Sequence, residues 1–196
     1  MAAGEKKYCV LVASANTKLR DFLAQILPVG DYEVLPNAGS AGEARRRFVS
    51  TRCNILVVNT PLPDEFGVEL AVDFADRPIG ILLLTEIQNY DQISHKAEEF
   101  GILTQAKPLS RQQAYASIKL LSALTNRLAK MEKAYKNLQE KVNDLRVVDR
   151  AKWLLIEKEG LTEEEAHRKI EKYAMDYRTS RRRAAEDIIR EYEDEM

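Results

Sequence analysis

The feature that most constrains the fold is a regular alternation of short apolar runs with segments of helical spacing through residues 7–110. The apolar runs are predicted strands at 8–12, 33–35, 55–58, 79–85 and 102–104. Because they are apolar without alternation, both faces of each strand should be buried. The segments between them place apolar residues three and four positions apart, as amphipathic helices do, at 17–27, 40–49, 67–76 and 88–100.

Buried strands that alternate with helices form parallel sheets with helices on both faces. The pattern therefore predicts an α/β flavodoxin-like fold, a five-stranded parallel sheet of order 2-1-3-4-5. Ligands of such sheets bind beyond the carboxyl ends of the strands. Candidate site residues are then Ser14, Ala15 and Asn16 after the first strand, and Asn59 after the third.

Residues 7–115 resemble the receiver domain of two-component response regulators. The resemblance rests on Asn59-Thr60-Pro61-Leu62-Pro63 followed by Gly67, on Thr85 at the end of the fourth strand, and on Lys107-Pro108 after the fifth. It implies a site in which an acidic pair holds Mg²⁺ and an Asp nucleophile accepts a phosphoryl group. Here the acidic pair is replaced by Ser14-Ala15 and the nucleophile by Asn59.

These replacements leave a degenerate phosphorylation pocket, formed by Ser14, Ala15, Asn59, Thr85 and Lys107. A neutral amide is a poor nucleophile, and a pocket without carboxylates holds Mg²⁺ poorly. We therefore predict no catalytic residue, no metal and no cofactor, and a regulator rather than an enzyme. Lys107 should hydrogen-bond Asn59 or a nearby carbonyl.

Two further positions bear on the same pocket. Asp64 follows Asn59 in the loop and is expected to be a solvated carboxylate rather than a substitute acceptor. Thr104 stands where the resemblance implies a switch aromatic residue. Both readings favour a pseudo-receiver that serves dimerisation or binds a protein regulator.

The chain changes character at Arg111, after which no Pro or Gly occurs up to Lys158. Apolar residues then recur at an unbroken spacing of three and four. They are Leu121, Leu124, Leu128, Met131, Tyr135, Leu138, Val142 and Leu145. This spacing predicts a long helix with a coiled-coil seam and hence a homodimer.

Two shorter helices are predicted after Gly160. A capping box, Thr162 to Glu165, opens one with Ala166, Ile170, Tyr173, Ala174 and Tyr177 on one face, and Thr179 or Ser180 opens the last. Segments 145–155, 161–166, 173–178 and 185–189 resemble the ANTAR domain, with Trp153 in place of the family's glycine. The resemblance implies binding to paired hairpins in nascent mRNA and suppression of transcription termination.

Basic side chains near helix ends suit phosphate contacts. The candidate RNA-binding residues are Arg146, Arg150, Lys152, Arg178, Arg181, Arg182 and Arg183. The alternative for each residue is that it simply lies on the solvated face of a charged helix. This alternative is weaker for Arg181 to Arg183, because three adjacent positive charges should repel one another without an anionic partner. Tyr173, Tyr177 and Trp153 are candidates for base stacking, with a core role favoured for Tyr173.

The predicted domains are a pseudo-receiver at 1–115, a coiled-coil linker at 116–148 and an ANTAR-like RNA-binding domain at 140–196. The leading hypothesis is an RNA-binding transcription antitermination regulator controlled without Asp phosphorylation. A protein-binding signalling scaffold and an atypical phosphorelay regulator are the alternatives.

Composition narrows the remaining possibilities. The net charge is −1, so RNA contacts must come from a local basic patch. Cys9 and Cys53 lie in or beside apolar runs and predict reduced core thiols. His95 and His167 have no neighbours that suggest a metal or catalytic site, and both are expected on the surface. With no candidate membrane span, a cytoplasmic protein with no membrane partner is expected.

Overall fold

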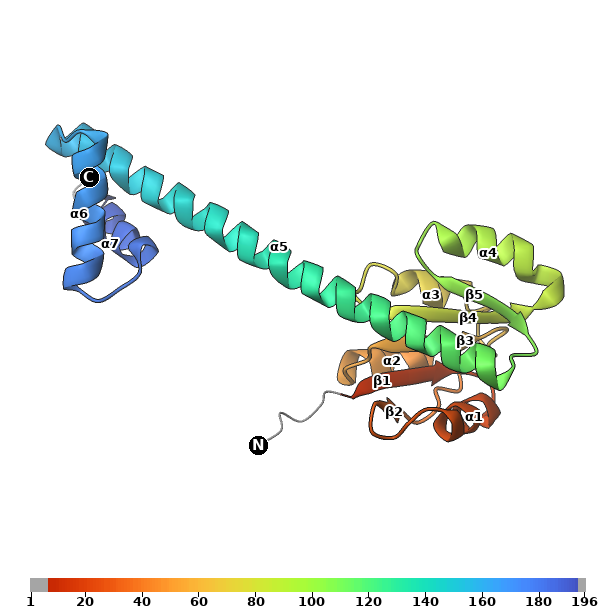
Figure 1. Cartoon of the computed structure of the whole chain (residues 1–196). Coiled ribbons are helices and arrows are strands. Elements are labelled where there is room, and N and C mark those ends of the chain that lie inside the picture. The colour runs from red at the N-terminus through yellow and green to blue at the C-terminus, as the bar shows by residue number, and fades with distance from the viewer. Residues whose placement is uncertain (1–6, 194–196) are drawn as a thin grey trace. The chain divides into compact units, whose positions relative to one another are not determined.

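A computed structural model describes residues 7–193 of the chain, and the predicted domain limits at residues 1 and 196 lie outside that range (Figure 1). The chain divides between Lys130 and Met131 into two compact units. The elements of the first unit are β1 Tyr8–Ala13, α1 Lys18–Ile26, β2 Tyr32–Val34, α2 Ala41–Ser50, β3 Ile55–Asn59, α3 Val68–Asp73, β4 Gly80–Glu86, the 3-10 helix η1 Ile87–Asn89, α4 Tyr90–Glu98 and β5 Leu103–Lys107. The helix α5 Arg111–Glu159 begins in the first unit and ends in the second. The helices α6 Glu163–Asp176 and α7 Arg181–Glu193 complete the second unit.

The sheet is parallel throughout and has the order β2-β1-β3-β4-β5, which confirms the predicted flavodoxin-like fold. Element limits differ from prediction by a few residues. Among the strands the largest shift is in β5, which pairs with β4 as far as Lys107. Gln105 and Lys107 near its end are polar, because β5 lies at the edge of the sheet and need not be buried on both sides.

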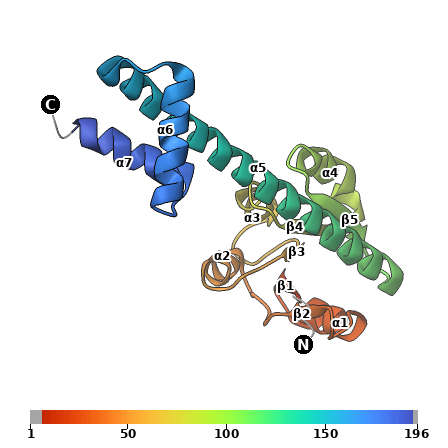
Figure 2. The same ribbon diagram turned by 60° about the vertical axis from the view of Figure 1, so that its left-hand side comes forward.

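Two cores cover the two faces of this sheet. Side chains of α2, α3 and α4 pack on one face, and α1 and the first turns of α5 pack on the other (Figure 1 and Figure 2). Within the second core, Leu121 of α5 is 3% exposed. A Cβ on Gly80 would lie 2.8 Å from the Leu121 Cβ, so glycine permits this close approach. The prediction that Leu121 belongs to the dimer seam is therefore wrong.

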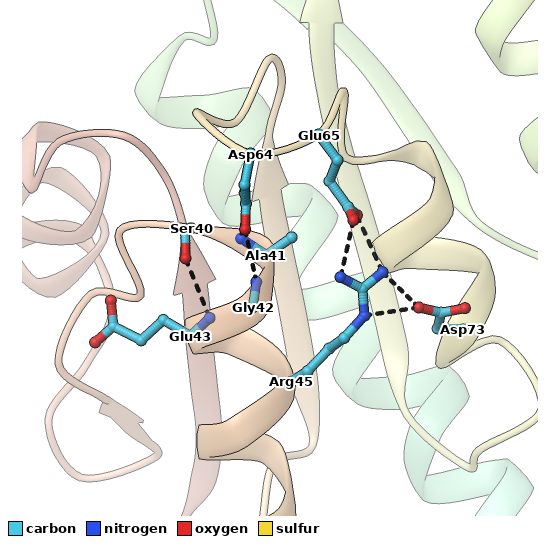
Figure 3. A network of polar contacts seen from close by, with 8 residues as sticks. All are labelled: Ser40, Ala41, Gly42, Glu43, Arg45, Asp64, Glu65 and Asp73. Atoms are coloured by element: carbon cyan, nitrogen blue, oxygen red, sulfur yellow. Dashed lines mark hydrogen bonds and ion pairs between the residues drawn. The ribbon is translucent and has the colours of Figure 1, made fainter.

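The loop between β3 and α3 is fixed to α2 by polar contacts (Figure 3). Asp64 accepts hydrogen bonds from the backbone N–H groups of Ala41 and Gly42, both at 2.9 Å. These bonds to Gly42 and Ala41 lower the pKa of the Asp64 carboxyl. The stabilisation is thus present at neutral pH and is lost as the pH falls through the lowered pKa. Asp64 is exposed, as expected of a loop carboxylate, and it also caps the N-terminus of α2.

Arg45 makes the second attachment of that loop. Its guanidinium contacts Glu65 at 2.8 Å and Asp73 at 2.6 Å, and these hydrogen bonds raise its pKa. Ser40 caps α2, because its Oγ accepts from the Glu43 N–H at 3.1 Å. The Glu43 carboxylate accepts from the Gly39 N–H at 2.7 Å, one residue before the position that a capping box requires.

The second unit is a small bundle made by the end of α5 with α6 and α7. Its buried residues are Ala151, Leu155, Ala166, Ile170, Ala174, Ala184, Ala185 and Ile188. The predicted capping box at Thr162 and Glu165 is present. Ser180 rather than Thr179 opens α7, since its Oγ accepts from the Arg183 N–H at 3.2 Å. Tyr177 shares a face with Tyr173, since their ring centroids lie 4.4 Å apart, but Tyr177 is 70% exposed.

The remaining predictions concern thiols, histidines and membrane spans. Cys53 is buried and Cys9 half-buried, and neither is in a disulfide. Burial raises the pKa of the Cys53 thiol to about 11. His95 is exposed, while His167 is half-buried with Nε2 3.3 Å from Glu171. Between residues 7 and 193, no helix combines the length and apolar character needed to cross a bilayer.

Candidate functional site

The residues of the degenerate phosphorylation pocket lie together at the carboxyl ends of β1, β3, β4 and β5. The Asn59 Nδ2 donates to the Ser14 Oγ at 3.0 Å. The Lys107 ammonium donates to the Thr60 carbonyl at 2.6 Å and lies 2.9 Å from a Glu86 carboxylate oxygen. The expectation that Lys107 hydrogen-bonds a nearby carbonyl is confirmed. Its ammonium also forms an ion pair with Glu86 of the same chain.

The same pocket does not fit Mg²⁺, the ion that the receiver fold implies. A groove of about 400 Å³ is lined by Asn16, Lys18, Leu19, Phe22, Asn59, Leu84, Lys107, Pro108 and Leu109, none of which is a carboxylate. Ser14 is fully buried and engaged by Asn59. Hard cations such as Mg²⁺ need oxygen ligands with negative charge, whereas this groove presents amide and lysine side chains.

The amide and hydroxyl oxygens of this pocket are incompletely satisfied. Within residues 7–193, Asn59 Oδ1 and Thr85 Oγ1 are buried without a hydrogen-bond partner. Thr104, at the position of the expected switch aromatic, is also buried. A small buried threonine cannot swing between an inward and an outward position as a large aromatic ring could. The pocket therefore combines two unsatisfied buried oxygens with a buried threonine at that position.

The predicted RNA-binding residues all lie in the second unit, and they differ in how their charges are engaged. Arg146 and Arg150 are exposed on α5, and Arg178 is exposed at the end of α6 with a left-handed φ of 51°. Lys152 is 17% exposed and forms ion pairs with Asp149 at 2.8 Å and Glu163 at 3.2 Å. Those hydrogen bonds raise the pKa of Lys152. Because Glu163 belongs to α6, its contact with Lys152 also joins α5 to the start of α6.

The arginines at the start of α7 each have an acidic partner. Arg181 lies 3.3 Å from Glu171, and Arg183 lies 3.6 Å from Asp187. Arg182 contacts Glu186 at 2.8 Å and Asp144 at 2.9 Å, and these bonds raise its pKa. The anionic partners expected for this cluster are therefore acidic side chains of the same chain. The pairs are exposed, and exposed pairs contribute roughly 0–1 kcal/mol each, so phosphates can replace these partners.

A groove of about 500 Å³ brings several of these residues together between α5, α6 and the start of α7. It is lined by Lys141, Asp144, Leu145, Val148, Asp149, Lys152, His167, Ser180, Arg181 and Arg182. Sequence reasoning missed Lys141 as a site residue. The sequence held no signal for it, because Lys141 meets Arg181 and Arg182 only where α7 packs beside α5.

The apolar seam on α5 continues beyond Leu121 as an exposed stripe. Its members Leu124, Leu128, Met131, Tyr135, Leu138, Val142 and Leu145 are 42–63% exposed. Large apolar side chains repeated on one face of a helix indicate a surface that another helix covers. Trp153 and Tyr177 are also exposed, while Tyr173 is half-buried against the bundle core, as expected.

Comparison with known proteins gives a family match within the second unit. Residues 136–189 match the ANTAR domain. Over 181 residues the chain is 28% identical to the transcriptional regulatory protein PdtaR of Mycobacterium tuberculosis, covering 92% of this chain and 88% of that protein.

Solved structures identify the fold of the first unit. The signal receiver domain of an HD domain-containing protein from Pseudomonas fluorescens Pf-5 aligns with 62% of this chain and 99% of its own, at 18% identity and a TM-score of 0.56. A structure named adenylate cyclase from Rhodopirellula baltica aligns with 67% of this chain and 98% of its own, at 17% identity and a TM-score of 0.60. The chain therefore contains an ANTAR domain at residues 136–189, preceded by a domain with the receiver fold.

Proposed function

We propose that this protein is an RNA-binding transcription antitermination regulator that acts on hairpins in nascent mRNA as a homodimer. The observation that carries the proposal is the basic groove of the ANTAR domain, in which Lys141, Lys152, Arg181 and Arg182 meet. The match of residues 136–189 to the ANTAR domain supports RNA as the anion that this groove receives. The exposed seam on α5 supports the dimer.

Dimerisation would give the protein two linked RNA sites. A target with two adjacent hairpins would engage both, and the second contact would benefit from a high effective concentration. Phosphate contacts would come from the exposed guanidiniums, and Trp153 and Tyr177 offer exposed rings for unpaired bases. An occupied hairpin can then prevent the RNA from forming a terminator.

Control is proposed to be independent of Asp phosphorylation. The support is the paired state of Lys107 and the absence of carboxylates among the residues that line the receiver groove. Oligomer state, a protein regulator on the receiver fold, or protein abundance would take the place of the phosphoryl group.

The charge reversal R181E/R182E/R183E tests RNA as the ligand. It is expected to weaken binding to a synthetic two-hairpin RNA by about a hundredfold or more and to lower the slope of log K against log salt by about three. The matched control K158E/R168E/K172E makes the same charge change on side chains outside the groove. Circular dichroism checks that the bundle survives, since Arg182 also contacts Asp144.

A specific observation favours the alternative, a protein-binding scaffold. Each of the three arginines already has an acidic partner within the chain. If wild-type protein binds no hairpin RNA at low salt, and the control and test variants behave alike, the scaffold reading replaces the RNA proposal.

Incubation with acetyl phosphate and Mg²⁺ tests the receiver pocket. Intact mass is expected to stay unchanged for the wild type and also for Asn59→Asp. The second result is expected because Ser14 and Ala15 supply no carboxylate for the metal even when the nucleophile is restored. A stable gain of one phosphate on the wild-type chain would reinstate the phosphorelay alternative.

A further inference from the structure

The heptad positions beside the α5 seam carry charges that specify how two copies pair. Counting Leu128, Tyr135 and Val142 as a positions places Leu124, Met131, Leu138 and Leu145 at d. The exposed residues at the flanking e and g positions include Arg127 at g, Glu132 at e, Lys141 at g and Arg146 at e.

In a parallel coiled coil, each g residue faces the e residue of the next heptad on the other helix. Arg127 would then face Glu132 of the partner subunit, which is an attraction. Glu132 also contacts Lys136 of its own helix at 3.1 Å, an exposed pair that is weak enough to exchange. An antiparallel coil places g opposite g and e opposite e. The g residues Arg127, Ala134 and Lys141 include no acid, and the overlap that pairs Leu124 with Val142 would set Glu132 against Glu132 of the partner subunit. Charge complementarity therefore selects a parallel dimer.

The same register produces a repulsion nearer the ANTAR bundle. Lys141 would face Arg146 of the partner subunit, and the two-fold symmetry repeats this contact on the other side of the coil. Within residues 7–193, neither Lys141 nor Arg146 has an acidic partner at ion-pair distance. The like charges are thus uncompensated at the point where the apolar seam ends, because the next a position is Asp149.

Lys141 connects this repulsion to the groove. Its side chain lines the groove together with Leu145 of the seam and Arg181 and Arg182 of α7. An anion held by these arginines would lie beside Lys141 and hence beside Arg146 of the partner subunit. We propose that the RNA phosphate backbone bridges Lys141 and Arg146 across a parallel homodimer, so that RNA binding closes the last heptads of the coil.

This inference rests on the proposed RNA-binding function and adds a coupling to it. Without RNA, repulsion between Lys141 and Arg146 weakens the C-terminal part of the coil, and the dimer is held by the seam and the Arg127–Glu132 pairs. With RNA, phosphates neutralise the four charges and both bundles are held at one end of a closed coil. RNA binding and dimer affinity must then strengthen each other by the same factor.

The variant Lys141→Glu tests the parallel register of the coil separately from the RNA bridge. It replaces two repulsive contacts with two attractive ones, so the dimer dissociation constant without RNA should fall roughly tenfold. Lys133→Glu makes the same charge change at a solvent-facing f position of the same helix and should leave dimer affinity within about twofold. Analytical ultracentrifugation over a range of salt concentrations measures both.

The coupling is measured by repeating the experiment with a synthetic RNA that carries a single hairpin, which cannot link two subunits by avidity as a two-hairpin RNA would, at low salt where sequence-independent phosphate contacts suffice. Wild-type and Lys133→Glu dimers should tighten about tenfold or more, whereas the Lys141→Glu dimer should change little. If Lys141→Glu dimerises no better than Lys133→Glu without RNA, the parallel register is wrong. If RNA binds without tightening the wild-type dimer, the bridge is wrong and the RNA-binding function stands. Failure of any RNA to bind contradicts the function, while the RNA-free comparison still tests the register.

Discussion

Replacing Leu138 with aspartate is expected to convert the protein from a dimer into a monomer and to abolish high-affinity binding to a two-hairpin RNA. Leu138 is a d position near the middle of the exposed stripe on α5. In a coiled coil its side chain would be buried against the second copy, where a carboxylate has no partner. Losing two buried leucines costs at least about 4 kcal/mol, roughly a thousandfold in the dissociation constant.

The matched control for this variant is Asn137→Asp. Asn137 is the adjacent residue and is exposed, so the substitution adds the same carboxylate outside the seam. Light scattering and RNA titration should find this control dimeric and fully able to bind. Because Leu138 is exposed on its own subunit, Leu138→Asp should leave the fold of each subunit unchanged. A dimeric Leu138→Asp protein would show that the dimer interface lies elsewhere.

Replacing Ile170 with alanine is expected to unfold the ANTAR bundle while leaving the receiver fold intact. Ile170 is fully buried among α5, α6 and α7. Truncation of a buried isoleucine costs about 2–5 kcal/mol, which is comparable to the whole stability of a small helical domain. The expected result is a lower helical signal, loss of RNA binding, and an unchanged transition for the first unit.

Met175→Ala is the control for that variant. Met175 is on the same helix, and its side chain is 71% exposed, so its truncation should change the free energy of unfolding by less than about 0.5 kcal/mol. Differential scanning calorimetry and circular dichroism distinguish the two variants. If Ile170→Ala melts as the wild type does, the bundle core is not organised around α6 as described.

The receiver fold was predictable because each strand is encoded by a local apolar run. Residues 8–12, 55–58 and 79–85 lack alternation, and only a sheet covered on both faces buries such strands completely. The limits of β5 were less predictable, because backbone pairing with β4 continues through polar residues at the sheet edge.

The polar contacts were the least predictable part. Asp64 lies 23 and 22 residues from the backbone N–H groups of Ala41 and Gly42 that it caps, and its role depends on the fold of the intervening chain. The same holds for Arg182, whose contact with Asp144 joins residues 38 positions apart. A run of three arginines therefore looked unpaired in the sequence and is paired in the structure.

The receiver pocket shows which features follow from the amino-acid sequence and which depend on the tertiary structure. The sequence by itself determined which chemistry is missing, since Ser14, Ala15 and Asn59 contain no carboxylate in any conformation. It also determined the period of the α5 seam, because helical spacing is a local property. Only the tertiary structure decided that Leu121 leaves the seam for the sheet core, that Lys107 is held by the Thr60 carbonyl, and that Lys141 joins the basic groove. Each of these depends on which distant elements pack together, and local residue patterns do not carry that information.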